Sequence, residues 1–264
     1  MSKETAGPRR AVGPVRRSGL GAFGVWVRDI VIVVVCALLV STLSRMFVVQ
    51  MFSVPTGSME TTLDVGDRFA VQKVARPQRG DIIVFRDTMH WLPNPLIDTS
   101  PMHEALAFVG FAPDESTGYL VKRLIGLPGD HVTCCDVQGR VSVNGVALDE
   151  TGYLYTDPGT GQQNVPSTYR FDLVVPAGTV FVMGDHRGAS ADSRCHLGQA
   201  TTGAPGSLAF IPQSNIVGTA IGIVYPFSRF RGFSRPATYA DVPAPSQPPP
   251  AEPVITNGAQ ITCG

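Results

Sequence analysis

The chain has 264 residues, of which 44% are apolar and 16% charged, and it contains 28 glycines and 22 prolines. This length predicts one large or two small domains. The composition excludes a chain that is disordered throughout, and it argues against a coiled coil, a helical bundle or a collagen-like repeat. The net charge is zero, but residues 1–28 hold six basic residues against one acidic residue, so the remainder is acidic.

An apolar segment follows the basic N-terminus. Residues 30–44 carry no charge, and the segment lengthens to residues 24–45 if Arg28 extends its charged end towards lipid headgroups. About 22 residues of helix are enough to cross the hydrocarbon core of a bilayer. Because basic residues stay on the cytoplasmic side, we predict a cytoplasmic tail at residues 1–23, one transmembrane helix at residues 24–45, and a single-pass protein of the cell membrane whose body is extracytoplasmic.

Two other interpretations of the apolar segment are open. A cleaved secretory signal also has a basic head and a short apolar stretch, but no convincing small-x-small cleavage site follows Val40. A buried pair of β-strands would explain the many Val and Ile residues, but the adjacent basic tail argues against it.

Short apolar runs separated by turn residues make up the body of the chain. They predict a mostly β, antiparallel domain at residues 46–235, with insertions at residues 87–118 and 134–179. Asn144-Gly145 is a strong hairpin signal, and the proline-rich residues 236–264 are predicted to be a disordered tail. The predicted strand runs are Phe69–Val74, Asp81–Phe85, Tyr119–Ile125, Arg140–Val143, Val180–Met183 and Ile216–Tyr225.

The five cysteines bear on the compartment. Cys36 lies in the predicted membrane helix. An exported domain lies in an oxidising compartment, so we predict a disulfide between Cys195 and either Cys134 or Cys135, with free thiols as the alternative. No Cys-x-x-Cys is present, and the five His residues have no metal-ligand spacing. We therefore expect neither a metal nor a cofactor.

Ser58 and Lys122 are candidate reactive residues. Ser58 follows Gly57 directly after the apolar segment, although a Ser in such a place is usually only a turn residue. The chain has 18 Arg and three Lys, and a buried Lys can lose its proton whereas Arg cannot. Lys122 lies in an apolar, strand-like stretch and is the candidate base, unless it is a surface Lys pointing out of a strand. Lys73 lies in a more polar stretch.

Five motifs, in order and behind the apolar segment, resemble those of bacterial type I signal peptidases, the Ser–Lys leader peptidases. The motifs are Pro55–Met59, Leu63 with Gly66-Asp67, Arg79–Phe85, Val121–Asp130 and Gly184–Arg194. The resemblance covers about residues 25–230. The paired cysteines Cys134-Cys135, together with Cys195, resemble the actinobacterial branch of the family.

The resemblance implies a fold and an activity. The fold is a signal-peptidase/LexA-like antiparallel β catalytic core preceded by one transmembrane helix, which makes residues 46–235 the peptidase domain. The activity is that of a membrane-bound serine endopeptidase that removes signal peptides from exported preproteins after small-x-small sites. Preproteins and the lipid bilayer are then the partners, nucleic acid is not, and we expect a monomer. A non-catalytic, membrane-anchored β binding module is the alternative. A soluble self-cleaving Ser–Lys repressor would need a DNA-binding head, for which residues 1–24 are too short.

The resemblance also assigns roles by position. Ser58 is the nucleophile and Lys122 the general base, the Thr56 hydroxyl joins the Ser58 N–H in the oxyanion hole, and Ser190 orients the lysine. Structural ion pairs that hold the last loop against the catalytic strand involve Arg123, Asp185, Asp192 and Arg194. The walls of the substrate pockets are Val54, Met59, Leu63, Leu120 and Val121.

The chain departs from the family pattern in two motifs. Thr61 replaces a usual Pro, while His186, Gly188 and Ala189 replace usual polar residues of the last motif. None of these changes removes a catalytic group, but they bear on the rigidity of the loop. A Ser-His-Asp triad through His186 is disfavoured, because Lys122 and Ser190 already fill its roles.

Overall fold

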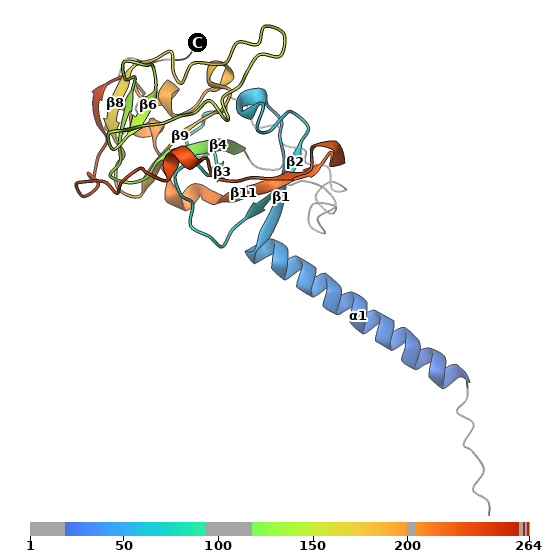
Figure 1. The fold of residues 1–264 in the computed structure, drawn as a ribbon. Coiled ribbons are helices and arrows are strands. Elements are labelled where there is room, and N and C mark those ends of the chain that lie inside the picture. The colour runs from blue at the N-terminus through green and yellow to red at the C-terminus, as the bar shows by residue number, and fades with distance from the viewer. Residues whose placement is uncertain (1–18, 93–117, 200–203, 259–260, 262, 264) are drawn as a thin grey trace, which may run out of the picture. The chain divides into compact units, whose positions relative to one another are not determined.

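The computed structural model describes residues 19–92, 118–199, 204–258, 261 and 263. The chain divides into two units between Ser44 and Arg45. The first unit contains helix α1 (Gly19–Phe47) over most of its length (Figure 1). The second is built from two antiparallel sheets, and short 3₁₀ turns lie between several of the strands. The predicted mostly β body preceded by one apolar helix is therefore confirmed.

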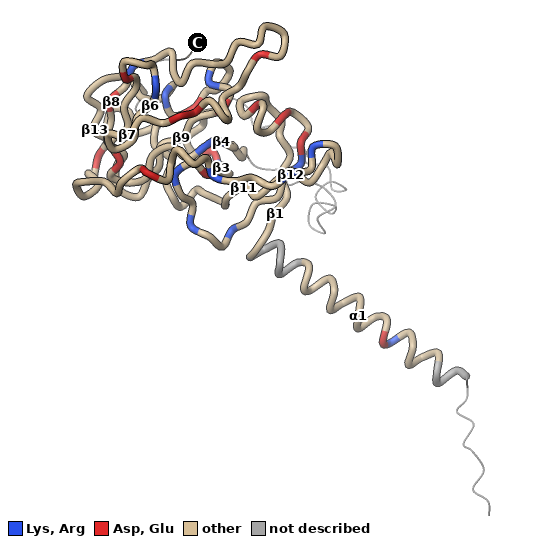
Figure 2. The backbone as a smooth tube through the Cα atoms, viewed as in Figure 1, with Lys and Arg blue, Asp and Glu red and all other residues tan. Residues whose placement is uncertain are grey.

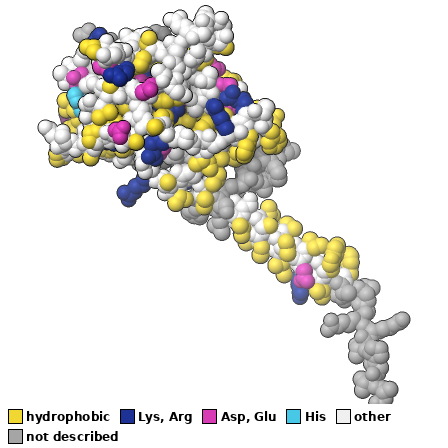
Figure 3. Space-filling view, viewed as in Figure 1, with side chains coloured by type: hydrophobic (Ala, Val, Ile, Leu, Met, Phe, Trp, Pro, Cys, Tyr) yellow, Lys and Arg dark blue, Asp and Glu magenta, His cyan; other side chains and the backbone are white. Residues whose placement is uncertain are grey.

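Helix α1 is mostly apolar and is longer than the predicted helix at residues 24–45. The segment Phe23–Ser41 has a mean hydropathy of 2.4, and its 19 residues span about 28 Å, close to the ~30 Å of a bilayer core. Hydrophobic side chains lie exposed around the helix (Figure 3). Its described charges are Arg28 and Asp29, which form an ion pair at 2.9 Å. Basic and acidic positions lie next to each other on the helix in Figure 2. Such a helix is long and apolar enough to cross a membrane.

The larger sheet has eight strands in the order β1-β2-β11-β3-β4-β9-β10, with β12 paired to β11. Its strands are β1 (Val49–Ser53), β2 (Arg68–Gln72), β3 (Ile82–Arg86), β4 (Tyr119–Gly126), β9 (Thr179–Met183), β10 (Ile211–Pro212), β11 (Ile216–Tyr225) and β12 (Arg231–Gly232). Alternate residues of β3 face opposite sides, as a pleated strand requires. Ile82 and Val84 join one apolar cluster, and Ile83 and Phe85 join another. The larger sheet is therefore covered by apolar side chains on both faces.

The smaller sheet has five strands in the order β13-β8-β5-β6-β7. Its strands are β5 (His131–Cys134), β6 (Val141–Val143), β7 (Val146–Ala147), β8 (Phe171–Val174) and β13 (Val254–Asn257). The 3₁₀ turns are η1 (Gly57–Met59), η2 (Arg187–Ala189), η3 (Ser193–His196), η4 (Ser207–Ala209), η5 (Gln213–Asn215), η6 (Phe227–Arg229) and η7 (Ala237–Tyr239). The predicted hairpin is confirmed, since Asn144 and Gly145 join β6 to β7 with positive φ angles of 51° and 82°.

The two predicted insertions differ in what the structure describes. Residues 93–117 of the first lie outside the described residues. The second, residues 134–179, supplies β6, β7 and β8 of the smaller sheet. A cluster of buried apolar side chains, including Val132, Leu173 and Phe181, joins this sheet to β9 of the larger one. The second insertion is therefore part of the core.

The prediction of a disordered C-terminal tail is wrong for the described residues after 235. Tyr239 and Val242 are buried in the core, and β13 pairs with β8. The proline carbonyls of this segment also accept hydrogen bonds, from Asn144 to Pro243 and from Ala177 to Pro250. A proline lacks an N–H but keeps its carbonyl oxygen as a hydrogen-bond acceptor. The segment is therefore ordered by hydrogen bonds and apolar contacts to the rest of the chain.

The predicted pairing of Cys195 with Cys134 or Cys135 is also wrong. Cys134 and Cys135 form a disulfide with each other, and Cys195 pairs with Cys263. The Cα atoms of Cys195 and Cys263 are 5.0 Å apart, within the range that a disulfide spans. Cys195 finds this partner because the ordered C-terminal segment returns to η3.

Candidate active site

Ser58 lies at the centre of the short 3₁₀ turn η1, which follows β1. Thr56 precedes the turn in an extended conformation (φ −133°, ψ 154°), and its side chain does not cap the turn. The Glu60 N–H donates to the Gly57 carbonyl at 3.1 Å and closes the turn. Ser58 is buried, with 7% of its surface exposed, whereas Thr56 is exposed. The chain thus turns sharply at the position where the sequence places its candidate nucleophile.

Lys122 lies in the middle of β4, opposite Ile83 of β3. Only 2% of its surface is exposed, and its Nζ lies 2.5 Å from Ser58 Oγ. Burial penalises the ammonium form and lowers the pKa of Lys122 to about 8; Asp192 raises it and Arg194 lowers it further. The structure therefore brings together two candidates that are 64 positions apart in the sequence. A neutral amine in this place can take a proton from the Ser58 hydroxyl.

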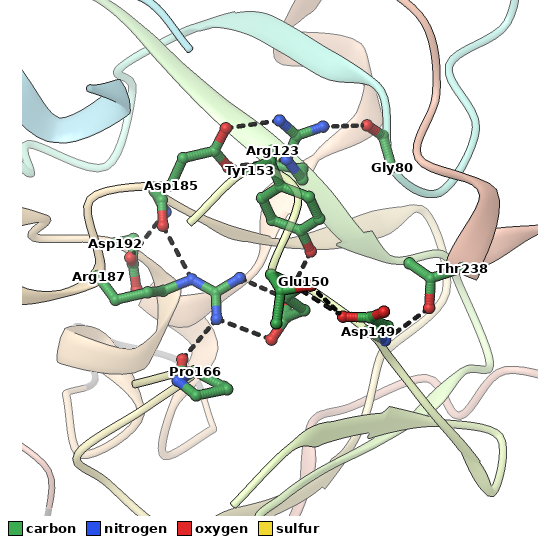
Figure 4. Close-up of polar contacts among 12 residues, drawn as sticks. Gly80, Arg123, Asp149, Glu150, Tyr153, Pro166, Asp185, Arg187, Asp192 and Thr238 are labelled. Atoms are coloured by element: carbon green, nitrogen blue, oxygen red, sulfur yellow. Dashed lines mark hydrogen bonds and ion pairs between the residues drawn. The ribbon is translucent and has the colours of Figure 1, made fainter. Parts of the chain in front are cut away.

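Arg123 ties β4 to the loop that follows β9. Its Nε and Nη2 donate to the two carboxylate oxygens of Asp185 at 2.7 and 2.5 Å, and its Nη1 donates to the Gly80 carbonyl at 2.7 Å (Figure 4). The Thr62 hydroxyl donates to the same carboxylate at 2.5 Å. All atoms of the pair are buried. This pair joins the strand of the candidate base to the last motif.

Asp192 and Arg194 form an ion pair within the loop itself. Arg194 Nε donates to Asp192 Oδ1 at 2.8 Å, and the Gly184 N–H donates to Asp192 Oδ2 at 2.9 Å. Burial alone would raise the pKa of Asp192, but Arg194 and the Gly184 N–H together lower it. Arg194 also donates to the Arg187 carbonyl at 2.9 Å. These hydrogen bonds fix the shape of the loop, and both charges act on Lys122 of β4 through their electrostatic effect on its pKa.

Ser190 lies beside the candidate nucleophile. Its Oγ is buried and has no hydrogen-bond partner among the described residues, so its assignment as the group that orients Lys122 stays a prediction. The packing here depends on Gly184. A Cβ on that residue would clash with Ser190 Oγ and would lie 2.5 Å from the Ser58 carbonyl oxygen. Gly184 is therefore required for the approach of Ser58 and Ser190.

The five predicted pocket residues do not all lie together. Val54, Met59 and Leu63 are buried in one apolar cluster, and Val121 packs against it. Leu120 packs instead against the cluster on the other side, which contains Phe85 and Leu124. Neighbouring residues of a strand face opposite sides of a sheet, so Leu120 and Val121 are separated for this reason.

A family model described as "Signal peptidase, peptidase S26" matches residues 26–225. The chain belongs to this signal peptidase family. Signal peptidase I of Mycobacterium tuberculosis (strain ATCC 25618 / H37Rv) is 35% identical over 240 residues, which cover 82% of this chain and 76% of that protein. The probable signal peptidase I of Mycobacterium leprae is 35% identical over 249 residues, covering 83% and 81%. Signal peptidase I of Bacillus licheniformis is 33% identical over 211 residues, covering 78% and 90%.

The crystal structure of a signal peptidase I from Enterococcus faecalis V583 is 26% identical, with a TM-score of 0.32, and the match covers 55% of this chain and 97% of that one. The resemblance drawn from the five motifs is confirmed by the family match and the mycobacterial relatives. Membership of the signal peptidase family implies a serine endopeptidase, and the apolar helix α1 fits a membrane-anchored enzyme.

The sequence did not reveal a third buried ion pair, which Arg187 forms with Glu150. Arg187 Nη2 and Nη1 donate to the Glu150 carboxylate at 2.5 and 3.0 Å, and the Tyr153 hydroxyl donates to it at 2.6 Å. Arg187 belongs to the last motif, but its partner lies 37 positions away in the second insertion. No local pattern marks Glu150. Figure 4 shows this pair beside the Arg123–Asp185 pair, on the same loop.

His186 contacts the backbone of the Ser58 turn. Its Nδ1 lies 3.2 Å from both the Gly57 carbonyl oxygen and Glu60 Oε2. Within the described chain, the hydrogen bond of the Ser58 hydroxyl is made to Lys122 and not to this ring. The geometry thus favours a Ser–Lys arrangement over a Ser-His-Asp triad. No group of three or more His, Cys, Asp or Glu residues in the described ranges could hold a metal ion.

Proposed function

We propose that the chain is a membrane-bound signal peptidase I that removes signal peptides from exported preproteins, with Ser58 as nucleophile and Lys122 as general base. The observation that carries this proposal is the 2.5 Å approach of Lys122 Nζ to Ser58 Oγ in a buried setting that lowers the lysine pKa to about 8. An ammonium could not accept the serine proton, whereas a neutral amine can. Membership of the signal peptidase family supports the substrate class.

The substrate binds as an extended strand near residues 52–55 and 119–122. Two features of the larger sheet support this placement. Among the described strands, β1 pairs with β2 alone, and β9 pairs with β4 only from Arg123 onward. A peptide can therefore add main chain to main chain. Shallow apolar pockets formed by the cluster around Val54 and Met59 accept small side chains at the first and third positions before the cut.

The reaction proceeds through an acyl-enzyme. Lys122 takes the hydroxyl proton of Ser58 as Oγ bonds to the scissile carbonyl carbon, and the resulting ammonium gives that proton to the leaving amine as the C–N bond breaks. Lys122 then takes a proton from water, whose oxygen attacks the ester, and returns it to Ser58. The Ser58 N–H and the Thr56 hydroxyl stabilise the oxyanion, each by about 3 kcal/mol.

The membrane anchor sets where this reaction takes place. Helix α1 crosses the bilayer once with the basic residues 1–23 in the cytoplasm, so the domain at residues 46–235 is extracytoplasmic. The enzyme acts as a monomer beside its substrates, whose signal peptides lie in the same membrane. Confinement to one surface raises their effective concentration.

A cleavage assay in detergent tests the proposal. The substrate is a preprotein with Ala at both small-residue positions, and the new N-terminus is sequenced. Wild type and Lys73→Ala, a matched control at a lysine outside the site, should cut once, after the second Ala. Ser58→Ala and Lys122→Ala should not cut. Full activity of Lys122→Ala would refute the dyad, and a folded wild type that makes no cut would favour a non-catalytic binding module.

A further inference from the structure

His186 holds the peptide groups on both sides of Ser58. Its backbone N–H donates to the Ser58 carbonyl at 3.1 Å. Its side-chain Nδ1 lies 3.2 Å from the carbonyl oxygen of Gly57. The Gly57 carbonyl belongs to the peptide unit that contains the Ser58 N–H, and the Ser58 carbonyl belongs to the next unit. One residue thus contacts both peptide units of the candidate nucleophile.

The partners of Nδ1 fix which ring nitrogen of His186 carries a proton. The Gly57 carbonyl oxygen can only accept a hydrogen bond, so the nitrogen that contacts it must be the donor. Glu60 Oε2 lies 3.2 Å from the same nitrogen. Nδ1 is therefore protonated and donates. The ring also stacks on Tyr155, with centroids 3.7 Å apart and planes inclined by 14°. This stacking holds the ring in the orientation that the hydrogen bond needs.

The planarity of the peptide group carries the effect of His186 to the reacting atoms. In a trans peptide the C=O and N–H bonds point in opposite directions, so a donor that holds the Gly57 oxygen also sets the direction of the Ser58 N–H. Gly57 has no side chain to restrict the rotation of this peptide. Its oxygen receives one other hydrogen bond in the described structure, from the Glu60 N–H within the single turn η1.

We propose that His186 is a positioning residue, whose Nδ1–H fixes the Gly57–Ser58 peptide so that the Ser58 N–H points into the oxyanion hole. This inference rests on the proposed function, in which that N–H stabilises the oxyanion. His186 touches neither the substrate nor Ser58 Oγ in this scheme. Its contribution is made in the transition state, where the oxyanion forms, so it changes kcat rather than KM.

Two substitutions separate the donor from the ring. His186→Phe keeps a ring to stack on Tyr155 but removes the donor, and His186→Asn removes the ring but keeps an amide N–H near the position of Nδ1. Both retain the backbone N–H that holds the Ser58 carbonyl. Loss of an oxyanion donor typically lowers kcat by about 10²–10³, so misdirecting one should lower kcat of His186→Phe roughly 10- to 100-fold with KM within about twofold. His186→Asn should stay within about fivefold of wild type.

The experiment measures kcat and KM for wild type and both variants on the preprotein substrate, with circular dichroism as the test of folding. Should His186→Phe fold poorly, His186→Met gives the same comparison without a donor. Wild-type kcat in the variant without a donor would overturn the inference, as would an equal loss in His186→Asn or a change confined to KM. In these cases cleavage by wild type and its loss in Ser58→Ala leave the proposed function standing. An inactive wild type would overturn both.

Discussion

The pH dependence of cleavage follows from the burial of Lys122. Because desolvation lowers its pKa to about 8, the neutral amine makes up about one eleventh of the enzyme at pH 7, about half at pH 8 and about ten elevenths at pH 9. If the neutral amine is the base, kcat/KM should rise about tenfold from pH 7 to pH 9 and level off above pH 9. An exposed lysine, with a pKa of about 10.4, would give a rise that continues beyond pH 10.

The assay is kcat/KM for the preprotein substrate from pH 6 to pH 10.5, since this ratio reports the ionisation of the free enzyme. Circular dichroism at each pH confirms that the domain stays folded. A Lys73→Ala control should give the same profile, because that lysine lies outside the site. A flat profile between pH 6 and pH 9, or a rise with no plateau by pH 10, would refute the assignment of a desolvated Lys122 as the base.

Three further predictions concern stability, measured by urea unfolding. Lys122→Met should raise the free energy of unfolding at pH 7 by up to about 3 kcal/mol. The pKa of Lys122 is lower in the folded state than in the unfolded state, so its burial destabilises the fold fully below pH 8, and this penalty disappears as the pH rises towards 10.4. No gain at pH 7 would contradict this. Cys195→Ser should lower the free energy of unfolding by about 4 kcal/mol, because the disulfide of Cys195 with Cys263 closes a loop with a sequence separation of 68. Unchanged stability would show that the C-terminal segment is held without the disulfide. Arg123→Met should lower the free energy of unfolding by about 3–5 kcal/mol, since it leaves the buried Asp185 carboxylate without its cation. The double variant Arg123→Met/Asp185→Asn should recover part of this loss.

The candidate site could be predicted from residue choice and order. Lys122 was identified as a candidate because Lys is rare in this Arg-rich chain and because its sequence neighbours are apolar. The structure places Lys122 in β4, where it is buried. The antiparallel β body followed from short apolar runs, and the hairpin at Asn144-Gly145 from local turn chemistry. These features depend on residues that are close together in the sequence, so local sequence patterns predict them.

The features that were mispredicted depend on distant neighbours. The proline-rich segment after residue 235 lacks enough apolar residues for a core of its own, but Tyr239 enters a core that the rest of the chain provides. Its return to η3 then decides the partner of Cys195. Glu150 was missed for the same reason, since its partner Arg187 is set by tertiary packing. The composition of a segment indicates whether that segment can fold by itself. It does not indicate contacts with distant segments, and each of these residues is placed by such a contact.

The buried cations around the site show how one of them is kept reactive. Three arginines each meet a buried carboxylate: Arg123 with Asp185, Arg187 with Glu150, and Arg194 with Asp192. Lys122 does not, since its Nζ hydrogen-bonds the Ser58 hydroxyl and, among the described residues, no carboxylate. The carboxylate that most raises its pKa is Asp192, whose effect is opposed by Arg194. The ion pair that shapes the last loop therefore also limits the negative charge felt by Lys122, and burial is left to set the pKa of the base.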